Sequence, residues 1–130
     1  MAAAGDIAKA AVPMGMLLAW CAAMHLLSRE FQDAHERKVL QVRMQEVGGS
    51  ELLVAGGGEL QRAMFSEAGQ QFLDRYYPRY LSDLAELFDG DIYEVEDNPA
   101  NYSKVAKMVT AHYMGRGEGV LKKISRWFRT

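Results

Sequence analysis

The chain has 130 residues, of which 49% are apolar and 25% are charged, and its formal net charge is −2. This composition is typical of folded protein and argues against wholesale disorder. The single cysteine, Cys21, excludes an internal disulfide framework and a cysteine-based zinc site, and the length allows one small domain at most.

The small net charge conceals a strong asymmetry along the chain. Residues 51–100 hold three basic and eleven acidic side chains, whereas residues 101–130 hold seven basic and one acidic. Blocks of like charge attract opposite charges, so we expect each block to face opposite charge within the chain or on a neighbouring protein.

Nineteen residues without a formal charge lie between Lys9 and Arg29. As a helix they would extend ~28 Å, close to the ~30 Å hydrocarbon thickness of a bilayer. We therefore predict a single transmembrane helix over residues 10–28. A cleaved signal peptide is disfavoured, because Asp6 lies where basic residues are expected. A buried core helix is the second alternative, but the rest of the chain has few apolar runs to surround such a helix.

Small residues recur every four positions along this helix and therefore share one face. Such a stripe lets other transmembrane subunits pack closely, and its members are Ala11, Gly15, Ala19 and Ala23. His25 is a candidate axial ligand for a haem or a chlorophyll. It lies one turn from the polar end of the helix, which favours exposure at the membrane interface, and we predict no cofactor.

The rest of the sequence predicts an all-α protein in three parts. Residues 1–47 comprise the transmembrane helix and a polar helical extension, because residues 29–47 contain good helix formers and no breaker. Residues 48–58 are predicted to be a glycine-rich linker with a short apolar anchor. Residues 59–130 are predicted to be a small soluble set of amphipathic helices, since strand signals are nearly absent.

Four helices are expected within this last part, from apolar spacing and from start signals. The second is expected to begin after Pro78, which should break the first. The third has the strongest start signal, because Asn98 suits the N-cap and Pro99 the first helical position. The four segments are 59–76, 79–88, 99–114 and 120–128.

The sequence carries no recognisable catalytic or metal-binding motif. Residues 89–94 superficially resemble a calcium loop, but Glu94 stands where glycine is required and Ala100 where a bidentate carboxylate is required. We interpret this segment as an exposed acidic turn. Ser/His/Asp, paired-cysteine and His-Glu zinc patterns are absent, so we predict a protein that is not an enzyme and binds no metal.

The C-terminal ten residues combine cations with aromatic side chains at helical spacing. This pattern suits an anionic lipid surface or a partner protein, and the expected contact residues are Lys122, Lys123, Arg126, Trp127, Phe128 and Arg129. Docking on an acidic protein surface that includes residues 83–97 is an equal alternative. Nucleic acid is disfavoured, because four cations without a binding-fold signature are a weak signal.

The predicted plan is similar to the single-pass supernumerary subunits of mitochondrial respiratory complexes. This resemblance is one of architecture alone and transfers no functional residue. It implies an accessory, non-catalytic subunit of the mitochondrial inner membrane that contributes to assembly and stability beside other transmembrane subunits. Two alternatives stay open: a small subunit of a photosynthetic complex in the thylakoid membrane, and a membrane-tethered adaptor or binding module.

Overall fold

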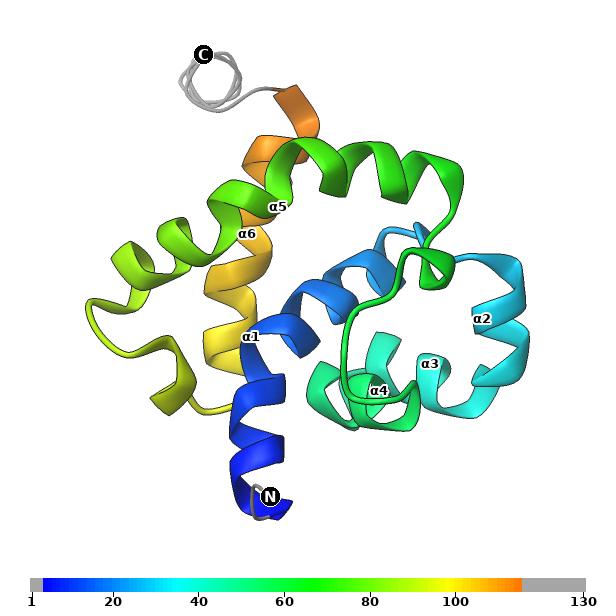
Figure 1. The fold of residues 1–130 in the computed structure, drawn as a ribbon, viewed down its shortest axis with the longest axis horizontal. Helices are drawn as coiled ribbons and strands as arrows, with labels where there is room; N and C mark the ends of the chain where they lie inside the picture. The colour runs from blue at the N-terminus through cyan, green and yellow to red at the C-terminus, as the bar shows by residue number, and fades with distance from the viewer. Residues whose placement is uncertain (1–3, 116–130) are drawn as a thin grey trace.

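The computed structural model describes the backbone of residues 4–115 and the side chains of residues 11–114 (Figure 1). These residues form six α-helices and two 3-10 helices with no β-strand among them, so the all-α prediction is confirmed for this part of the chain. In chain order the elements are α1 (Ala4–Ala23), α2 (Arg29–Ala34), α3 (Glu36–Arg43), α4 (Gly49–Ala55), η1 (Arg62–Met64), α5 (Glu67–Phe88), η2 (Ile92–Glu94) and α6 (Pro99–Gly115).

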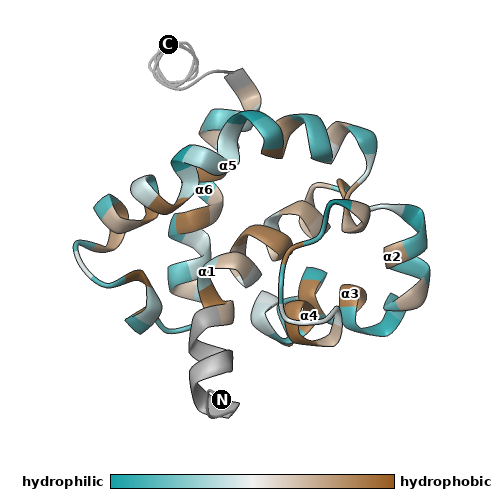
Figure 2. Cartoon of the chain, in the orientation of Figure 1, coloured by the Kyte–Doolittle hydropathy of each residue, from teal (hydrophilic) through white to brown (hydrophobic). Residues whose placement is uncertain are grey.

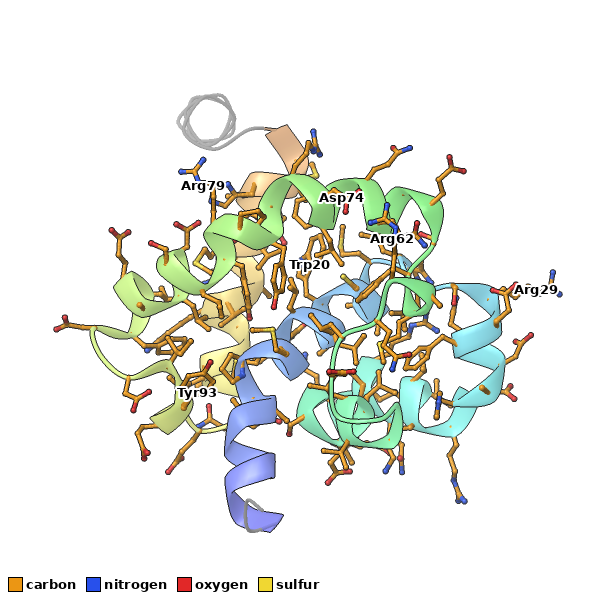
Figure 3. All side chains as sticks on the ribbon, in the orientation of Figure 1. Trp20, Arg29, Arg62, Asp74, Arg79 and Tyr93 are labelled. Carbon is orange, nitrogen blue, oxygen red and sulfur yellow. The ribbon has the colours of Figure 1, made fainter. Side chains whose placement is uncertain are left out.

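Helix α1 runs through the middle of the fold, and the later helices pack around it (Figure 1). Figure 2 shows that the central part of α1 is mainly apolar, whereas many hydrophilic residues lie along the other helices. Trp20 points into the interior between α1 and α5 (Figure 3), and its indole N–H donates to the Thr110 hydroxyl of α6 at 3.0 Å. Its ring also packs on Phe72 and Tyr113. The apolar segment is therefore the core of this fold.

No α-helix in the described part of the chain combines the length and the apolar character needed to cross a bilayer. The predicted transmembrane helix over residues 10–28 is therefore wrong, and the integral-membrane location built on it is not supported. The prediction is wrong because a buried helix does not need continuous apolar runs elsewhere in the chain to cover it. The cover instead comes from single apolar residues spaced along every later element, including Val39, Val42, Leu52, Leu53, Phe65, Phe72, Tyr80, Leu84, Val105 and Val109.

Helices α1 and α4 cross with their backbones in direct contact. A Cβ atom on Gly15 would lie 2.6 Å from Ser50 Cα and 2.7 Å from Gly49 C, closer than side chains pack. A Cβ on Gly49 would overlap the Gly15 carbonyl and lie 2.8 Å from the Ala19 methyl group. Helix α4 lies within the segment predicted to be a linker, and its Leu52 and Leu53 are buried. The two glycines thus allow a helix crossing that larger residues would prevent.

The predicted continuous helix from the apolar segment to Val47 is broken in two places. The chain leaves α1 at His25, whose φ of 58° is left-handed, and α2 restarts with the Ser28 hydroxyl accepting from the Phe31 N–H at 3.1 Å. Arg43 of α3 secures the end of α1: its Nε donates to the Ala22 carbonyl at 2.8 Å, and a terminal nitrogen donates to Gln32 at 2.8 Å. A cation at a helix C-terminus is favourable for the helix dipole.

Helix α5 differs from both helices predicted for its region. It begins later than expected, at Glu67, where the Ser66 hydroxyl accepts from the Gly69 N–H at 3.2 Å. It then continues through Pro78 to Phe88. The start of α6 is as predicted, because the Asn98 side chain accepts from the Asn101 N–H at 2.8 Å.

Candidate binding site

The most uneven charge distribution in the described part of the chain lies in residues 83–97, which we call the acidic segment. It holds seven carboxylates and no lysine or arginine. It comprises the last turns of α5, a turn at Asp89, the 3-10 helix η2 and the extended residues that lead to α6. The turn at Asp89 is left-handed, with a φ of 49°.

The middle of the acidic segment faces solvent. Glu86, Asp89 and Asp91 are exposed, and none forms an ion pair with another described residue. The Asp91 carboxylate accepts from the Tyr93 N–H at 2.9 Å, which shapes the turn. Leu87 and Tyr93, in the same segment, are exposed at 37% and 45%, and Figure 3 labels Tyr93 near η2. The segment therefore presents negative charge together with apolar contact area.

A pocket of about 160 Å³ lies at the end of the acidic segment, between α1, the turn that follows α3, and the start of α6. Buried Ala19 and Val42 form part of its wall, whereas Gln45 and Glu46 are exposed. The other lining residues are Val47, Gly48, Gly49, Asp97, Asn98, Pro99 and Tyr102. Two of the lining residues are acidic and none is basic, so the pocket carries negative charge.

Asp97 connects the pocket to helix α4. Its Oδ2 accepts from the Ser50 hydroxyl and from the Ser50 N–H at 3.4 Å, so it occupies the first turn of that helix. The carboxylate lies against the backbone of Gly48, where any Cβ atom would overlap it. The backbone of Gly48-Gly49-Ser50 therefore contacts both the Asp97 carboxylate and helix α1. Tyr102 completes the pocket, and desolvation raises its pKa to about 12, so the phenol is neutral at physiological pH.

A second, more open hollow of about 390 Å³ lies along the first half of α5. Arg62 and Asp74 line it and form a two-pronged ion pair with N–O distances of 2.7 and 2.9 Å (Figure 3). Hydrogen bonding to Arg62 lowers the pKa of Asp74. Because these two charges already satisfy one another, this hollow offers no unpaired charge to attract a ligand.

The strongest arrangement of acid–base groups joins α5 to α6. His112 Nε2 lies 3.1 Å from Asp83 Oδ2, although the atoms are not aligned for a hydrogen bond. The His112 ring packs on Tyr76, and the Tyr76 hydroxyl is buried without a hydrogen-bond partner among the described residues. Desolvation and the nearby Asp83 raise the Tyr76 pKa. None of the contacts described for His112 brings a serine, threonine or cysteine to it.

Cys21 is equally unsuited to chemistry. It is fully buried, and desolvation raises its pKa to about 12, which suppresses the reactive thiolate. His25 is exposed, with Nδ1 3.3 Å from a terminal nitrogen of Arg43. Within the described residues no group of three potential metal ligands comes together.

The small-residue stripe predicted for helix packing lies largely inside the fold. Ala11, Gly15 and Ala19 are buried, and Ala23 is exposed. Gly15 and Ala19 pack against α4 of the same chain. The predicted lipid or partner contacts, Lys122, Lys123, Arg126, Trp127, Phe128 and Arg129, lie outside the described residues.

The pocket could not be predicted from the sequence. Its acidic members, Glu46 and Asp97, are 51 positions apart and belong to no shared motif. The one available signal is Gly48-Gly49-Ser50, which in sequence also suits a linker. A glycine pair has the same appearance in sequence whether it gives flexibility or a close backbone approach.

Comparison with known proteins shows that the chain matches a family whose description assigns no activity. Residues 3–97 match the family described as Domain of unknown function (DUF7832). No curated protein and no solved structure matches the chain. The matched range includes the core helix α1, helix α4 and the whole acidic segment.

Proposed function

This chain belongs to the DUF7832 family, and we propose that it is a non-catalytic binding module that recognises a basic protein partner through its acidic segment. One observation carries the proposal. Seven carboxylates occur within fifteen consecutive residues that contain no lysine or arginine, and the carboxylates of Glu86, Asp89 and Asp91 are exposed.

The fold supports this proposal because it supplies a rigid base for the segment. Leu84 is buried, and η2 packs against both α1 and α5. A surface held in place loses little conformational entropy when a partner binds. Complementary charge accelerates association and rejects partners of like charge, while exposed Leu87 and Tyr93 add apolar contact.

The proposal keeps one part of the function expected from sequence. An accessory role in a larger assembly requires a docking surface, and the acidic segment supplies one. The assignment to a respiratory or photosynthetic complex depended on the membrane span, and it stays an untested prediction without support from the described residues.

Affinity capture with matched variants tests the proposal. The test variant is Glu86→Gln, Asp89→Asn and Asp91→Asn. Asparagine tolerates the left-handed conformation at position 89, and at position 91 its side-chain oxygen can still accept the hydrogen bond from the Tyr93 N–H. The control variant removes three exposed carboxylates elsewhere, by Glu30→Gln, Glu59→Gln and Glu67→Gln. Full-length wild type and both variants are used as baits, and captured proteins are quantified by mass spectrometry.

We expect a specific partner with a basic surface to be depleted at least tenfold with the test variant and retained with the control, as expected for a loss of about 1.4 kcal/mol. Equal depletion with both variants would indicate nonspecific attraction to net charge and would refute the proposal. Full retention of every captured protein by the test variant would refute it equally.

A further inference from the structure

We propose that the pocket at the end of the acidic segment receives one arginine side chain of the partner protein. This inference rests on the proposed function and gives the acidic surface a point of specific recognition. It follows from the size of the pocket, from the charges that line it and from the apolar character of its wall.

The size of the pocket selects a single side chain. Small-molecule and cofactor sites usually enclose ~300–1,000 Å³, whereas one liquid water occupies ~30 Å³. The volume of about 160 Å³ is therefore too small for a cofactor and several times larger than one water needs. One long amino-acid side chain matches this volume.

The charges select a cation. Glu46 and Asp97 line the pocket, and no lysine or arginine does. The Glu46 carboxylate has no hydrogen bond or ion pair with another described residue, and Asp97 uses only Oδ2 in the bonds to Ser50. Oδ1 of Asp97 and the carboxylate of Glu46 are thus acceptors without donors from the described part of the chain.

Two helix N-termini close to the pocket would by themselves favour an anion. Both are already occupied by the chain's own side chains. Asp97 accepts from the Ser50 N–H at the start of α4, and Asn98 accepts from the Asn101 N–H at the start of α6. The N–H groups of Ser50 and Asn101 are therefore taken, whereas the carboxylates of Glu46 and Asp97 still offer acceptors.

Arginine fits these features better than lysine. Its guanidinium presents five N–H donors in a planar fork and can bond two carboxylates at once, whereas an ammonium is a compact point charge with a stronger hydration shell. The methylene stem of arginine can lie on Ala19 and Val42, which form a buried apolar wall. Tyr102, neutral and half-buried, offers a ring face and a hydroxyl.

NMR titration of the full-length, ¹⁵N-labelled chain tests the inference without knowledge of the partner. The probe is the capped peptide acetyl-Gly-Arg-Gly-amide. Its controls are the same peptide with citrulline, which has the shape of arginine without the charge, and the same peptide with lysine. We expect the arginine peptide to bind with a Kd of about 1–10 mM, as for a fragment of this size, and to shift the amide signals of Gly48, Gly49, Asp97, Asn98 and residues 100–102.

Variants locate the binding and separate this inference from the proposed function. Glu46→Gln changes an exposed side chain, so the fold is retained, and we expect arginine-peptide binding to weaken about fivefold to tenfold. Glu59→Gln, which removes an exposed carboxylate away from the pocket, should leave binding unchanged. Binding of the citrulline or lysine peptide as tight as that of the arginine peptide would overturn the inference.

Signal shifts spread along residues 83–94 instead of the pocket would overturn it as well, and so would an unchanged Kd for Glu46→Gln. In those cases the acidic segment could still bind a partner, because the triple variant at residues 86, 89 and 91 tests that separately. A partner that is lost with the triple variant but retained by Glu46→Gln would leave the proposed function standing and this inference refuted.

Discussion

Replacement of Gly15 by alanine tests the close crossing of α1 and α4. Helix propensity alone predicts that the substitution stabilises the protein, whereas the overlap at the crossing predicts that it destabilises the protein. In an isolated or loosely packed helix, Gly→Ala stabilises by ~1 kcal/mol through helix propensity. In this fold the new Cβ would lie 2.6 Å from Ser50 Cα, whereas ordinary contacts begin at 3.4 Å. The obstacle is backbone, which cannot rotate away as a flexible side chain would.

The size of the effect follows from the displacement that this overlap requires. Helices α1 and α4 must separate by ~0.8 Å, and a gap of that size forfeits a quarter to a half of each affected van der Waals contact. Leu52 and Leu53 of α4 are fully buried and would lose contacts. Overpacking of this kind costs about 3 kcal/mol, and the gain in propensity offsets ~1 kcal/mol, so we expect a net destabilisation of ~2 kcal/mol.

Urea unfolding followed by far-ultraviolet circular dichroism measures this difference. With a slope of ~2 kcal/mol per molar, the midpoint of Gly15→Ala should fall by ~1 M. Gly90→Ala is the matched control, because its nearest neighbour would be the Phe88 carbonyl at 4.0 Å and its φ is not left-handed. The control should be as stable as wild type or ~0.4–1 kcal/mol more stable. A midpoint for Gly15→Ala at or above the wild-type value would refute the α1–α4 crossing.

Three further outcomes follow from single contacts. Cys21 should resist alkylation at mildly alkaline pH in the native protein and react fully in denaturant, because burial raises its pKa to about 12; rapid native labelling, seen by intact mass, would contradict its burial. Arg43→Met should cost ~1–3 kcal/mol in the same unfolding assay by removing the donors to the Ala22 carbonyl and to Gln32 and leaving that carbonyl only the longer bond from the His25 N–H at 3.3 Å, and Arg43→Lys should not fully restore the stability. Pro78→Ala should raise the midpoint by up to ~1 M, because an exposed proline inside α5 lacks a backbone donor, and an unchanged midpoint would show that the helix is already distorted there.

Local sequence signals predicted the elements whose determinants are local. The start of α6 is one example, because capping by Asn98 and the fixed φ of Pro99 act within one helical turn. The continuity of α5 through Pro78 shows the limit of such signals. The cost of a proline inside a helix, ~3 kcal/mol, is smaller than the packing that a helix gains from several buried side chains, and Phe72, Tyr76, Tyr80 and Leu84 are all buried on α5.

The environment of the apolar segment could not be predicted, because it depends on distant parts of the chain. A stretch of nineteen uncharged residues satisfies the length of a membrane span and also that of a central core helix. The two cases differ in whether the rest of the chain covers it, and the covering residues are dispersed. The pocket is hidden for the same reason, since Glu46 and Asp97 meet only after α1, α4 and α6 are in place.

The placement of α1 at the centre of the fold has a consequence for biosynthesis. This helix leaves the ribosome before the other helices described here, yet Trp20 hydrogen-bonds to a residue 90 positions later. Until residues 105–113 emerge, the face of α1 that packs on α6 stays exposed to water, with Val105 and Val109 absent from it. A growing chain therefore displays an apolar helix that resembles a membrane-targeting segment until α6 has been synthesised. Premature termination before α6 would make that temporary exposure permanent, and the product would be a substrate for chaperones and proteases.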